Sequence, residues 1–361
     1  MKILFNNTIF FDQRFGGISR YFVNLANELE KLNLDYTISA PIYKNLYLKH
    51  FNKKRVKGFF VKRYPKNKII ENLNIFFENK IIKKISPNLV HDTYYSCNLY
   101  KNFNFKKIIT VHDLIHEKLI KYYGMNIQNK LNDKKLAIKN SDFIICVSNT
   151  TKKNLIDYYN IAENKIKVVY HGADHLDNIN SSNLNISKDF LLYVGSRSKY
   201  KNFNLLLNAF SSNEKIKKNF DLICFGGGKF SKNEIENLKK LKIYNNVKLI
   251  LNNEDAILKY LYLNAKLLVI TSEMEGFGIP IIEAMRNKCK ILASDIDTFK
   301  EIGNDKINYF ESKNLDSLIY ELESSIFKNN DDLITQALEY SENFKWSKCA
   351  KNTFEIYSKM K

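Results

Sequence analysis

Residues 266–283, Lys-Leu-Leu-Val-Ile-Thr-Ser-Glu-Met-Glu-Gly-Phe-Gly-Ile-Pro-Ile-Ile-Glu, carry the strongest pattern in this chain. The apolar run at 266–270 predicts a buried parallel strand. The Glu-Gly-Phe-Gly at 275–278 predicts a loop hinged on glycine. Pro280 suits the first position of a helix, because its fixed φ fits there and its missing N–H is not needed. We therefore expect a strand, a loop and a helix in this order, with Glu283 in the first turn of the helix.

Two carboxylates, Glu275 and Glu283, flank this loop, which ends in the free N–H groups of the predicted helix. Free helix N–H groups and the positive end of the helix dipole attract phosphate, and carboxylates accept hydrogen bonds from hydroxyl groups. The combination suits a ligand with sugar hydroxyls at both ends and a diphosphate between them, which is a nucleotide sugar. Ordinary helix capping, with Glu283 complementing the dipole, is the alternative explanation.

The stretch also resembles the signature of the retaining glycosyltransferases of family 4, which have the GT-B fold. Their pattern is Glu, seven residues and Glu, with Gly-Phe-Gly after the first Glu and Glu-Ala-Met at the second, and residues 283–285 complete it here. The family usually has Gly and Pro where this chain has Lys288 and Lys290. The resemblance implies an α/β protein with two Rossmann-like, doubly wound parallel-sheet domains facing a cleft.

The same architecture is indicated by apolar strand-like runs that alternate with helical patterns, six in the first half and five in the second. This is the βαβ rhythm of a doubly wound sheet occurring twice. The polar segment 177–188 lacks periodicity and marks the boundary. We expect an acceptor-side domain over 1–177 and a nucleotide-sugar-binding domain over 188–343. The resemblance adds that a helix over 345–361, opened by Trp346, crosses back to the first domain.

Two cationic residues, Arg197 and Lys201, follow the strand-like run at 190–194. Arg is scarce in this Lys-rich chain, and its planar fork suits bidentate phosphate binding, while Lys201 adds a point charge. The segment 193–210 resembles the family's diphosphate-binding stretch, whose Arg and Lys hold the leaving nucleotide diphosphate. The alternative is a pair of surface cations near a helix start, where a cation is mildly unfavourable.

Loops of the expected first domain carry Gly16-Gly17 and His112-Asp113. A double glycine lets the backbone approach a ligand closely, although any tight turn can use it. Gly16 and Gly17 match the family's first-strand loop, which faces the diphosphate and the transferred sugar. His112-Asp113 resembles the family's Val-His-Asp segment, in which the His lies beside the donor sugar.

Two further patterns could hold a ligand. His112 and His116 are four residues apart, as are His171 and His175, which is the spacing of a helical zinc site. No third ligand is evident, so we expect no metal. The Gly-Gly-Gly-Lys at 226–229 looks like a phosphate loop but lacks the Gly-Lys-Ser/Thr ending of a Walker site. The family often has a glycine pair there, near the nucleotide, and a plain tight turn is equally consistent.

The resemblance implies retaining transfer of a hexose from a nucleotide sugar, without a cofactor or a metal. It assigns catalysis to four residues and substrate binding to six: Arg197, Lys201, Glu275 and His112, and then Gly16, Gly17, Gly276, Phe277, Gly278 and Glu283. Arg197, Lys201 and the helix N–H groups would stabilise charge on the departing diphosphate. Glu275 would orient the sugar hydroxyls and Glu283 the ribose. No carboxylate nucleophile is identifiable, and the family's accepted picture is same-face attack, with the leaving phosphate helping to take the acceptor's proton.

The choice of donor depends on three segments, 16–21, 111–114 and 200–203, which look most like bacterial mannosyltransferases of surface-polysaccharide assembly. GDP-mannose is therefore the first choice and a UDP-sugar the second. The acceptor would be a lipid-linked saccharide or an oligosaccharide of a lipopolysaccharide O-antigen or a capsule. A non-catalytic nucleotide-sugar or polyanion binder and a sugar-nucleotide epimerase on the same fold remain alternatives.

Charge is concentrated in the first half of the 361-residue chain, which carries a net +19 in all. Residues 1–180 hold 30 Lys and Arg against 15 Asp and Glu, with Phe59-Phe60 and Phe76-Phe77 among the basic clusters. Such a surface could dock on anionic lipid, at roughly 1 kcal/mol per well-placed Lys or Arg. A solvated surface that simply follows from the Lys-rich composition is equally consistent. No nucleic-acid-binding motif is visible, so we expect no nucleic-acid partner.

The remaining composition bears on the compartment. No apolar run reaches the roughly 18 residues that span a bilayer, and we expect no signal peptide. Five scattered cysteines without a Cys-x-x-Cys pair favour a reducing cytosol and argue against disulfides or zinc. We expect a cytoplasmic protein that is peripheral on the inner face of the cell membrane.

Overall fold

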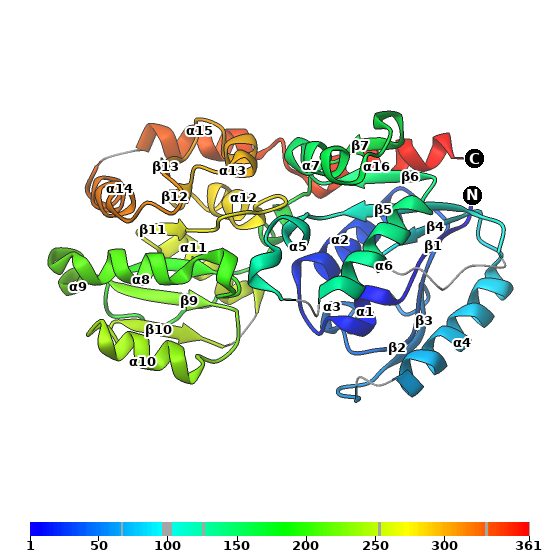
Figure 1. Ribbon diagram of the computed structural model, residues 1–361, viewed down its shortest axis with the longest axis horizontal. Helices are drawn as coiled ribbons and strands as arrows, with labels where there is room; N and C mark the ends of the chain where they lie inside the picture. The colour runs from blue at the N-terminus through cyan, green and yellow to red at the C-terminus, as the bar shows by residue number, and fades with distance from the viewer. Residues whose placement is uncertain (66–67, 96–102, 125–126, 252–253, 329–330, 361) are drawn as a thin grey trace. The chain divides into compact units, whose positions relative to one another are not determined.

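The computed structural model describes residues 1–65, 68–95, 103–124, 127–251, 254–328 and 331–360. The chain divides into two compact units (Figure 1), the first made of Met1–His171 and Trp346–Lys361 and the second of Gly172–Lys345. The division falls at Gly172, a few residues before the polar segment 177–188. No helix in the described ranges combines the length and the apolar character that crossing a membrane requires.

The first unit is built on a parallel sheet with the order β3-β2-β1-β4-β5-β6-β7, which has seven strands in the described part of the chain. The strands are β1 Ile3–Phe5, β2 Tyr36–Tyr43, β3 Val56–Phe60, β4 Leu89–Asp92, β5 Lys106–Val111, β6 Phe143–Cys146 and β7 Ile166–Val168. The order reverses between β1 and β4, which is the switch point of a doubly wound sheet.

Helices of the first unit cover the sheet, so Leu4, Phe5 and Ile108 at its centre are fully buried. The helices are α1 Thr8–Asp12, α2 Gly17–Lys31, α3 Leu46–Lys49, α4 Lys68–Ile85, α5 Ile115–Lys118, α6 Gln128–Lys139, α7 Asn149–Tyr159 and α16 Trp346–Lys359. α16 ends the chain and packs against α2 (Figure 1). Trp346 is 3% exposed, and the hydroxyl of Tyr357 lies 2.6 Å from Nδ1 of His91. The sole tryptophan is therefore a packing residue of the first unit.

The second unit repeats the architecture with the order β10-β9-β8-β11-β12-β13, six parallel strands among the residues described. The strands are β8 Phe190–Val194, β9 Asp221–Phe225, β10 Val247–Ile250, β11 Leu267–Ile270, β12 Ile291–Ser294 and β13 Asn308–Phe310. The helices are α8 Phe203–Ser212, α9 Glu214–Asn219, α10 Lys232–Lys240, α11 Asp255–Asn264, α12 Ile279–Arg286, α13 Asp297–Gly303, α14 Leu315–Phe327 and α15 Asp331–Ser341. The order reverses between β8 and β11.

The two stretches by which the chain enters and leaves the second unit are held together within it. The N–H of Ala173 donates to the carbonyl of Phe344 at 3.1 Å. Arg286 of α12 binds both stretches, through an ion pair with Asp177 and a bond to the carbonyl of Ser341 at 3.2 Å. Part of the polar segment is therefore anchored by specific contacts.

The expected fold class is confirmed, because both sheets are parallel, Rossmann-like and doubly wound. Four cysteines are buried as thiols: Cys146, Cys224, Cys289 and Cys349. Cys97 lies outside the described residues.

Candidate active site

The switch point of the second sheet is where open α/β sheets bind ligands, just beyond the carboxyl ends of the strands. Strands β8 and β11 are neighbours there, paired through Leu191 and Leu267. The loop after β8 carries Lys201, and the loop after β11 carries Glu275. Nζ of Lys201 and Oε1 of Glu275 form an ion pair, with 22% and 14% of the two side chains exposed. The structure thus brings together two predicted site residues 74 positions apart.

Short polar contacts fix the geometry of this pair. The hydroxyl of Thr271 donates to the carbonyls of Lys201 and Asn202 at 2.8 and 3.0 Å, which joins the β11 loop to the β8 loop. The hydroxyl of Ser272 donates to the Glu275 carboxylate at 2.7 Å. The ion pair therefore lies on a pre-formed backbone.

The loop after β11 ends at Gly278, whose φ of +112° is a conformation that favours glycine. A Cβ atom there would also approach the ring of Phe299 to 3.1 Å. Helix α12 starts at the next residue, so its N-terminus lies on the same loop as Glu275. Gly276 and Phe277 are buried, and the Phe277 ring packs 6.0 Å from that of Phe344. The Phe277 side chain is therefore a packing element.

Glu283 is the fifth residue of α12 and not part of its first turn, so the expected position is wrong. The side chain is 4% exposed and faces the interior. Its carboxylate accepts a hydrogen bond from the Tyr262 hydroxyl at 2.8 Å and lies 3.1 Å from Nε2 of His175. Capping of the helix dipole is thereby excluded as its role, while ribose binding stays a prediction.

Arg197 makes contacts that the sequence did not reveal. Its Nε donates to Glu234 at 2.6 Å, and its terminal nitrogens donate to the carbonyls of Gly226, Gly228 and Lys229 at 3.1, 2.9 and 3.1 Å. Only 4% of the side chain is exposed. The guanidinium is thus surrounded by protein acceptors, and direct phosphate binding by Arg197 stays a prediction.

Glu234 is a functional candidate that the sequence analysis missed. It closes a capping box at the start of α10, because its Oε2 accepts from the N–H of Ser231 at 2.7 Å while the Ser231 hydroxyl accepts from the N–H of Glu234. Burial raises the pKa of Glu234, but the bonds from Ser231 and Arg197 outweigh it and lower that pKa below its ordinary value. The Ser-x-x-Glu spacing at 231–234 signals the cap in the sequence, but not the partner Arg197.

In the first unit, Gly16 and Gly17 open the fifteen-residue helix α2. Gly16 is the N-cap, and its carbonyl accepts from the Ser19 hydroxyl at 3.0 Å. Gly17 is exposed, and a Cβ atom added there would meet nothing within 4 Å. Gly17 therefore leaves open space in front of the N-terminus of α2.

His112 lies just after β5 and is 9% exposed. Its ring stacks on His171 with centroids 5.6 Å apart and meets the Tyr21 ring edge-on at 5.2 Å. Burial, together with the nearby His91 and Lys134, lowers the pKa of His112 to about 3. Among the described residues its Nε2 has no hydrogen-bond partner. His112 is therefore a neutral, buried ring whose Nε2 has no hydrogen-bond partner in the described part of the chain.

A buried ion pair fixes the loop that follows His112. Nζ of Lys134 lies 2.8 Å from Glu117 and donates to the carbonyl of Asp113 at 2.6 Å. The two charged side chains are 3% and 0% exposed. The Tyr159 hydroxyl donates to the same carboxylate at 2.8 Å. Lys134 and Glu117 thus position the backbone next to His112, and nothing in the sequence marks the two as partners.

The two histidine pairs with zinc-like spacing are not brought into a metal site. His171 stacks on His112, and His175 lies beside Glu283. Within the described ranges, no three His, Cys, Asp or Glu side chains are grouped so as to hold a metal ion.

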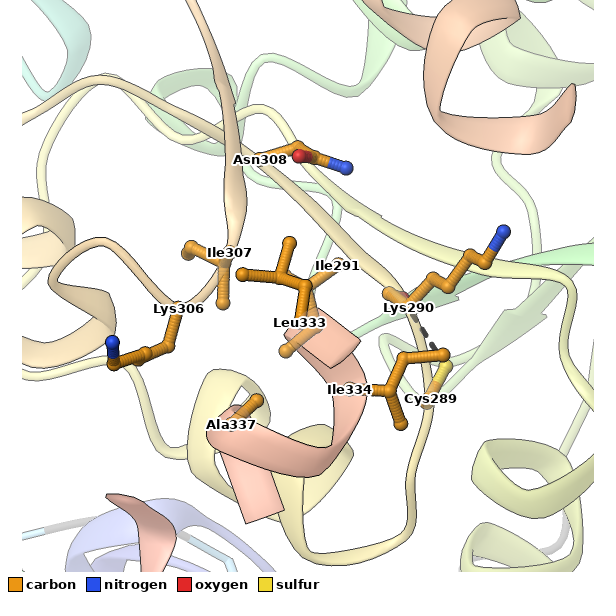
Figure 2. Close-up of a pocket in the computed structure, with 9 residues that line it drawn as sticks. All are labelled: Cys289, Lys290, Ile291, Lys306, Ile307, Asn308, Leu333, Ile334 and Ala337. Atoms are coloured by element: carbon orange, nitrogen blue, oxygen red, sulfur yellow. Dashed lines mark hydrogen bonds between the residues drawn. The ribbon is translucent and has the colours of Figure 1, made fainter. Parts of the chain in front are cut away.

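A small pocket of the second unit lies at the opposite end of its sheet (Figure 2). Ile291, Asn308 and Ala337 are among the residues that line it, from β12, β13 and α15. Ile291 and Asn308 are the first residues of their strands, so the pocket is at the amino ends. Ligands of open α/β sheets bind at the carboxyl ends, so this pocket is not the candidate active site.

Comparison with known proteins agrees with this fold. The model of the family described as Glycosyltransferase Family 4 matches residues 15–175, and that of Glycosyl transferases group 1 matches residues 174–339. The O-antigen chain mannosyltransferase RfbU of Salmonella typhimurium is 28% identical over 252 residues, 67% of each chain. An uncharacterized glycosyltransferase of Methanocaldococcus jannaschii is 27% identical over 368 residues, covering 96% of this chain and 95% of its own. The structure of HepE from Anabaena with UDP and glucose matches with a TM-score of 0.78 at 16% identity, over 99% of this chain and all of HepE.

The fold and the two consecutive family matches define a glycosyltransferase with the GT-B fold. Within that class the chain belongs to the family 4 type, in which a Family 4 region is followed by a group 1 region. The resemblance noted in residues 275–285 is thereby confirmed.

Proposed function

We propose that this glycosyltransferase moves a hexose, first of all mannose from GDP-mannose, onto a saccharide of a cell-surface polysaccharide, with retention of configuration. The observation that carries the proposal is the Lys201–Glu275 pair at the switch point, beside the start of α12. The similarity to RfbU, whose name assigns it to O-antigen mannosyl transfer, supports the choice of mannose and of a polysaccharide such as O-antigen, lipopolysaccharide or capsule.

The ion pair has a use in the catalytic cycle. Each charge of the pair compensates the other, and both side chains are partly open to solvent. A bound donor offers phosphate to the Lys201 ammonium and sugar hydroxyls to the Glu275 carboxylate, so both groups exchange one partner for another. Lys201 and the N–H groups at the start of α12 then stabilise the charge that develops on the departing diphosphate.

The transfer step needs no nucleophile from the enzyme. The bond between the anomeric carbon and the phosphate oxygen breaks, and the acceptor oxygen attacks on the face that the leaving group vacates. The acceptor's proton passes to the departing diphosphate. Glu275 keeps its hydrogen bond from Ser272 and, once Lys201 has turned to the phosphate, orients the sugar hydroxyls. His112, a neutral ring whose Nε2 has no partner among the residues described, would hydrogen-bond the transferred sugar, and no metal or cofactor takes part.

The acceptor is proposed to be lipid-linked, on the strength of the outer face of α4. Ile69, Leu73, Phe76 and Phe77 are 71%, 45%, 52% and 44% exposed on this helix, and Lys80, Lys83 and Lys84 continue the exposed surface. The inner face instead carries Asn74, which bonds the backbone of Ile42, and the buried Glu78. A helix with apolar and cationic side chains turned outward fits the surface of an anionic bilayer. The protein would then be cytoplasmic and peripheral on the membrane.

A donor panel tests the proposal. Purified protein is given GDP-mannose, UDP-glucose, UDP-galactose and UDP-N-acetylglucosamine, each with and without EDTA, and released GDP or UDP is measured. We expect the fastest release from GDP-mannose, no effect of EDTA, and, when a saccharide acceptor is supplied, a glycosidic product whose anomeric configuration by NMR matches the donor's. Lys201→Met should lower turnover by about a hundredfold or more, because it removes a charge that stabilises the leaving group. Lys199→Met, an exposed neighbour in the same turn, is the matched control and should leave turnover unchanged.

Each rival function has its own outcome in this assay. A non-catalytic binder would bind a nucleotide sugar and release no nucleotide. An epimerase would convert one nucleotide sugar into another without releasing free diphosphate. Equal turnover by wild type and Lys201→Met would remove the role given to the ion pair.

A further inference from the structure

We propose that Arg197 is a positioning residue: with Glu234 it holds the loop 226–229 in a left-handed turn whose exposed N–H groups take up the diphosphate of the nucleotide. The guanidinium itself does not touch the phosphate. We call Arg197, Glu234 and the loop 226–229 the Arg197 latch. The proposal rests on the proposed function, since it names the part of the site that binds the nucleotide.

The guanidinium of Arg197 already has protein acceptors for most of its N–H groups. It has five N–H donors in a fixed fork. One goes to Glu234, one to Gly226, and the second terminal nitrogen serves the carbonyls of Gly228 and Lys229. The plane also lies over the Phe230 ring, 4.7 Å from its centroid. A phosphate would have to break this shell to reach a side chain that is only 4% exposed.

The loop 226–229 has a left-handed backbone that brings it close to Arg197. Gly226, Gly227 and Gly228 have φ values of +85°, +73° and +75°, three left-handed residues in succession. A Cβ atom on Gly227 would lie 2.8 Å from Nη1 of Arg197 and 2.9 Å from the carbonyl of Gly195. Arg197 therefore fits against this turn so closely that glycine is required at 227 for space as well as for conformation.

The turn leaves backbone N–H groups exposed. Its carbonyls point to Arg197, and in the described part of the chain the N–H groups of Gly227 and Gly228 make no hydrogen bond. Both glycines and Lys229 are exposed. Successive N–H groups in a turn form a concavity that binds anions. The loop follows β9, which pairs with β8, so it lies at the carboxyl end of a strand next to the switch point.

Glu234 completes the latch by fixing the guanidinium from the other side. One carboxylate oxygen accepts from Arg197 and the other from the N–H of Ser231. The loop, the Arg and the start of α10 therefore form one hydrogen-bonded unit. Loosening either side chain should free the loop, which raises the entropic cost of binding a diphosphate without changing the transfer step.

The experiment separates positioning from direct contact. GDP and UDP affinities are measured by calorimetry for wild type, Glu234→Gln, Arg197→Lys and Gly227→Ala, together with kcat for GDP-mannose. We expect each variant to raise the Kd about tenfold and to leave kcat within about threefold, because binding energy and not transition-state charge is lost. Ser231→Ala breaks the capping box but leaves the Arg197–Glu234 contact, so its Kd should stay within about twofold of wild type.

Direct phosphate binding by Arg197 predicts the reverse. Glu234→Gln would then release the guanidinium and tighten GDP binding, Gly227→Ala would be neutral, and Arg197→Lys would lower kcat by about a hundredfold. That pattern would overturn the proposal.

A second readout needs no catalysis. The chain has only 12 glycines, so protein labelled with 15N-glycine gives few amide signals. The amides of Gly227 and Gly228 should be rigid, with an order parameter of about 0.85, and Glu234→Gln should lower it to about 0.6 or less. GDP should shift both signals in wild type. Unchanged order parameters in Glu234→Gln would refute the latch. If wild type bound neither GDP nor UDP, the donor assignment would fail, whereas the order parameters would still decide whether the latch holds the loop.

Discussion

Each unit holds an ion pair near the carboxyl ends of its strands, and the two pairs differ in their exposure to solvent. In the first unit, ionisable groups are buried: Lys134 and Glu117 are almost completely enclosed, and His112 is kept neutral. In the second unit, Lys201 and Glu275 meet at the surface of the switch point and stay partly exposed. The Lys134–Glu117 pair is therefore internal and fixed, whereas the Lys201–Glu275 pair presents charges that a ligand can reach.

The difference in exposure separates an ion pair that serves folding from one that is available for chemistry. A buried pair is costly to break, because the partner that remains keeps an uncompensated charge away from water. A partly exposed pair contributes little to stability, since solvent compensates whichever charge is left. The first unit should therefore lose stability, and the second activity, when a charge is removed.

The largest expected effect is on Lys134. Lys134→Met should lower the free energy of unfolding of the first unit by about 3–5 kcal/mol, because Glu117 is left buried without its partner. Lys201→Met should change the stability of the second unit by about 1 kcal/mol or less. Trp346 is the single tryptophan and lies in the first unit, so its fluorescence in urea follows that unit, while far-UV circular dichroism follows both.

The double variant Lys134→Met/Glu117→Gln is the control for this comparison. It removes both charges and keeps an acceptor for the Tyr159 hydroxyl. It should regain at least half of the lost stability, as expected for two residues in contact. Equal loss in Lys134→Met and in Lys201→Met would abolish the distinction between the two units.

The sequence predicted the fold well, because the strands that build the sheets are buried and read as apolar runs. β8 and β11 are of this kind. β3 escaped notice because it is an edge strand whose residues 57–59 are exposed, so no apolar run marks it. β13 is only three residues long. Local pattern thus reveals the central strands and the edge strands β7 and β10, and it misses β3 and β13, for which tertiary pairing decides.

The candidate site could be predicted only as far as local motifs reach. Residues 275–285 identified the β11 loop, but the partners of Arg197 and Glu283 lie far away along the chain. Nothing in the sequence marks Glu234 or Tyr262 as those partners. Lys134 is one of several lysines of α6, and only the structure shows that it is buried. Side-chain pairing between loops is a property of the folded chain and leaves no periodic trace.

A smaller effect is expected at the outer surfaces of the two units. Phe76→Ser/Phe77→Ser removes two exposed rings from α4 and should weaken binding to vesicles containing phosphatidylglycerol by about tenfold or more, since each buried ring contributes about 1.5–3 kcal/mol. Tyr320→Ser on α14 is the matched control, because Tyr320 is 72% exposed on the second unit, and it should leave binding unchanged. Flotation with neutral and anionic vesicles measures the effect. Equal binding to both vesicle types would exclude an electrostatic contribution to membrane binding. Full binding by the double variant would exclude α4 as the membrane-binding element.

The smallest effect concerns the pH dependence that buried carboxylates give the first unit. Burial raises the pKa of Glu78 to about 8 and that of Asp92 to about 7. Between the ordinary value near 4.5 and these raised values, the folded chain holds more protons than the unfolded chain, so stability falls as pH rises. The lowered pKa values of His91 and His112, about 3, act in the opposite direction, and this contribution fades as pH rises through 6.5, the ordinary value of a histidine; it is the same in wild type and in a carboxylate variant. The window from pH 6.5 to 8 therefore isolates the carboxylates.

Glu78→Gln tests this account within that window, because it removes the titrating group and keeps an acceptor for the N–H of Asn7. Urea unfolding followed by Trp346 fluorescence gives the free energy of unfolding at each pH. In Glu78→Gln the fall of this free energy with pH should become smaller by about 1 kcal/mol per pH unit, near the limit of about 1.4 kcal/mol per pH unit that one proton sets. Glu71→Gln, at a partly exposed carboxylate in the first turn of the same helix, should leave the slope unchanged. An unaltered slope in Glu78→Gln would show that this carboxylate is charged in the folded chain, and the first unit would then resemble the second in exposing its acids to solvent.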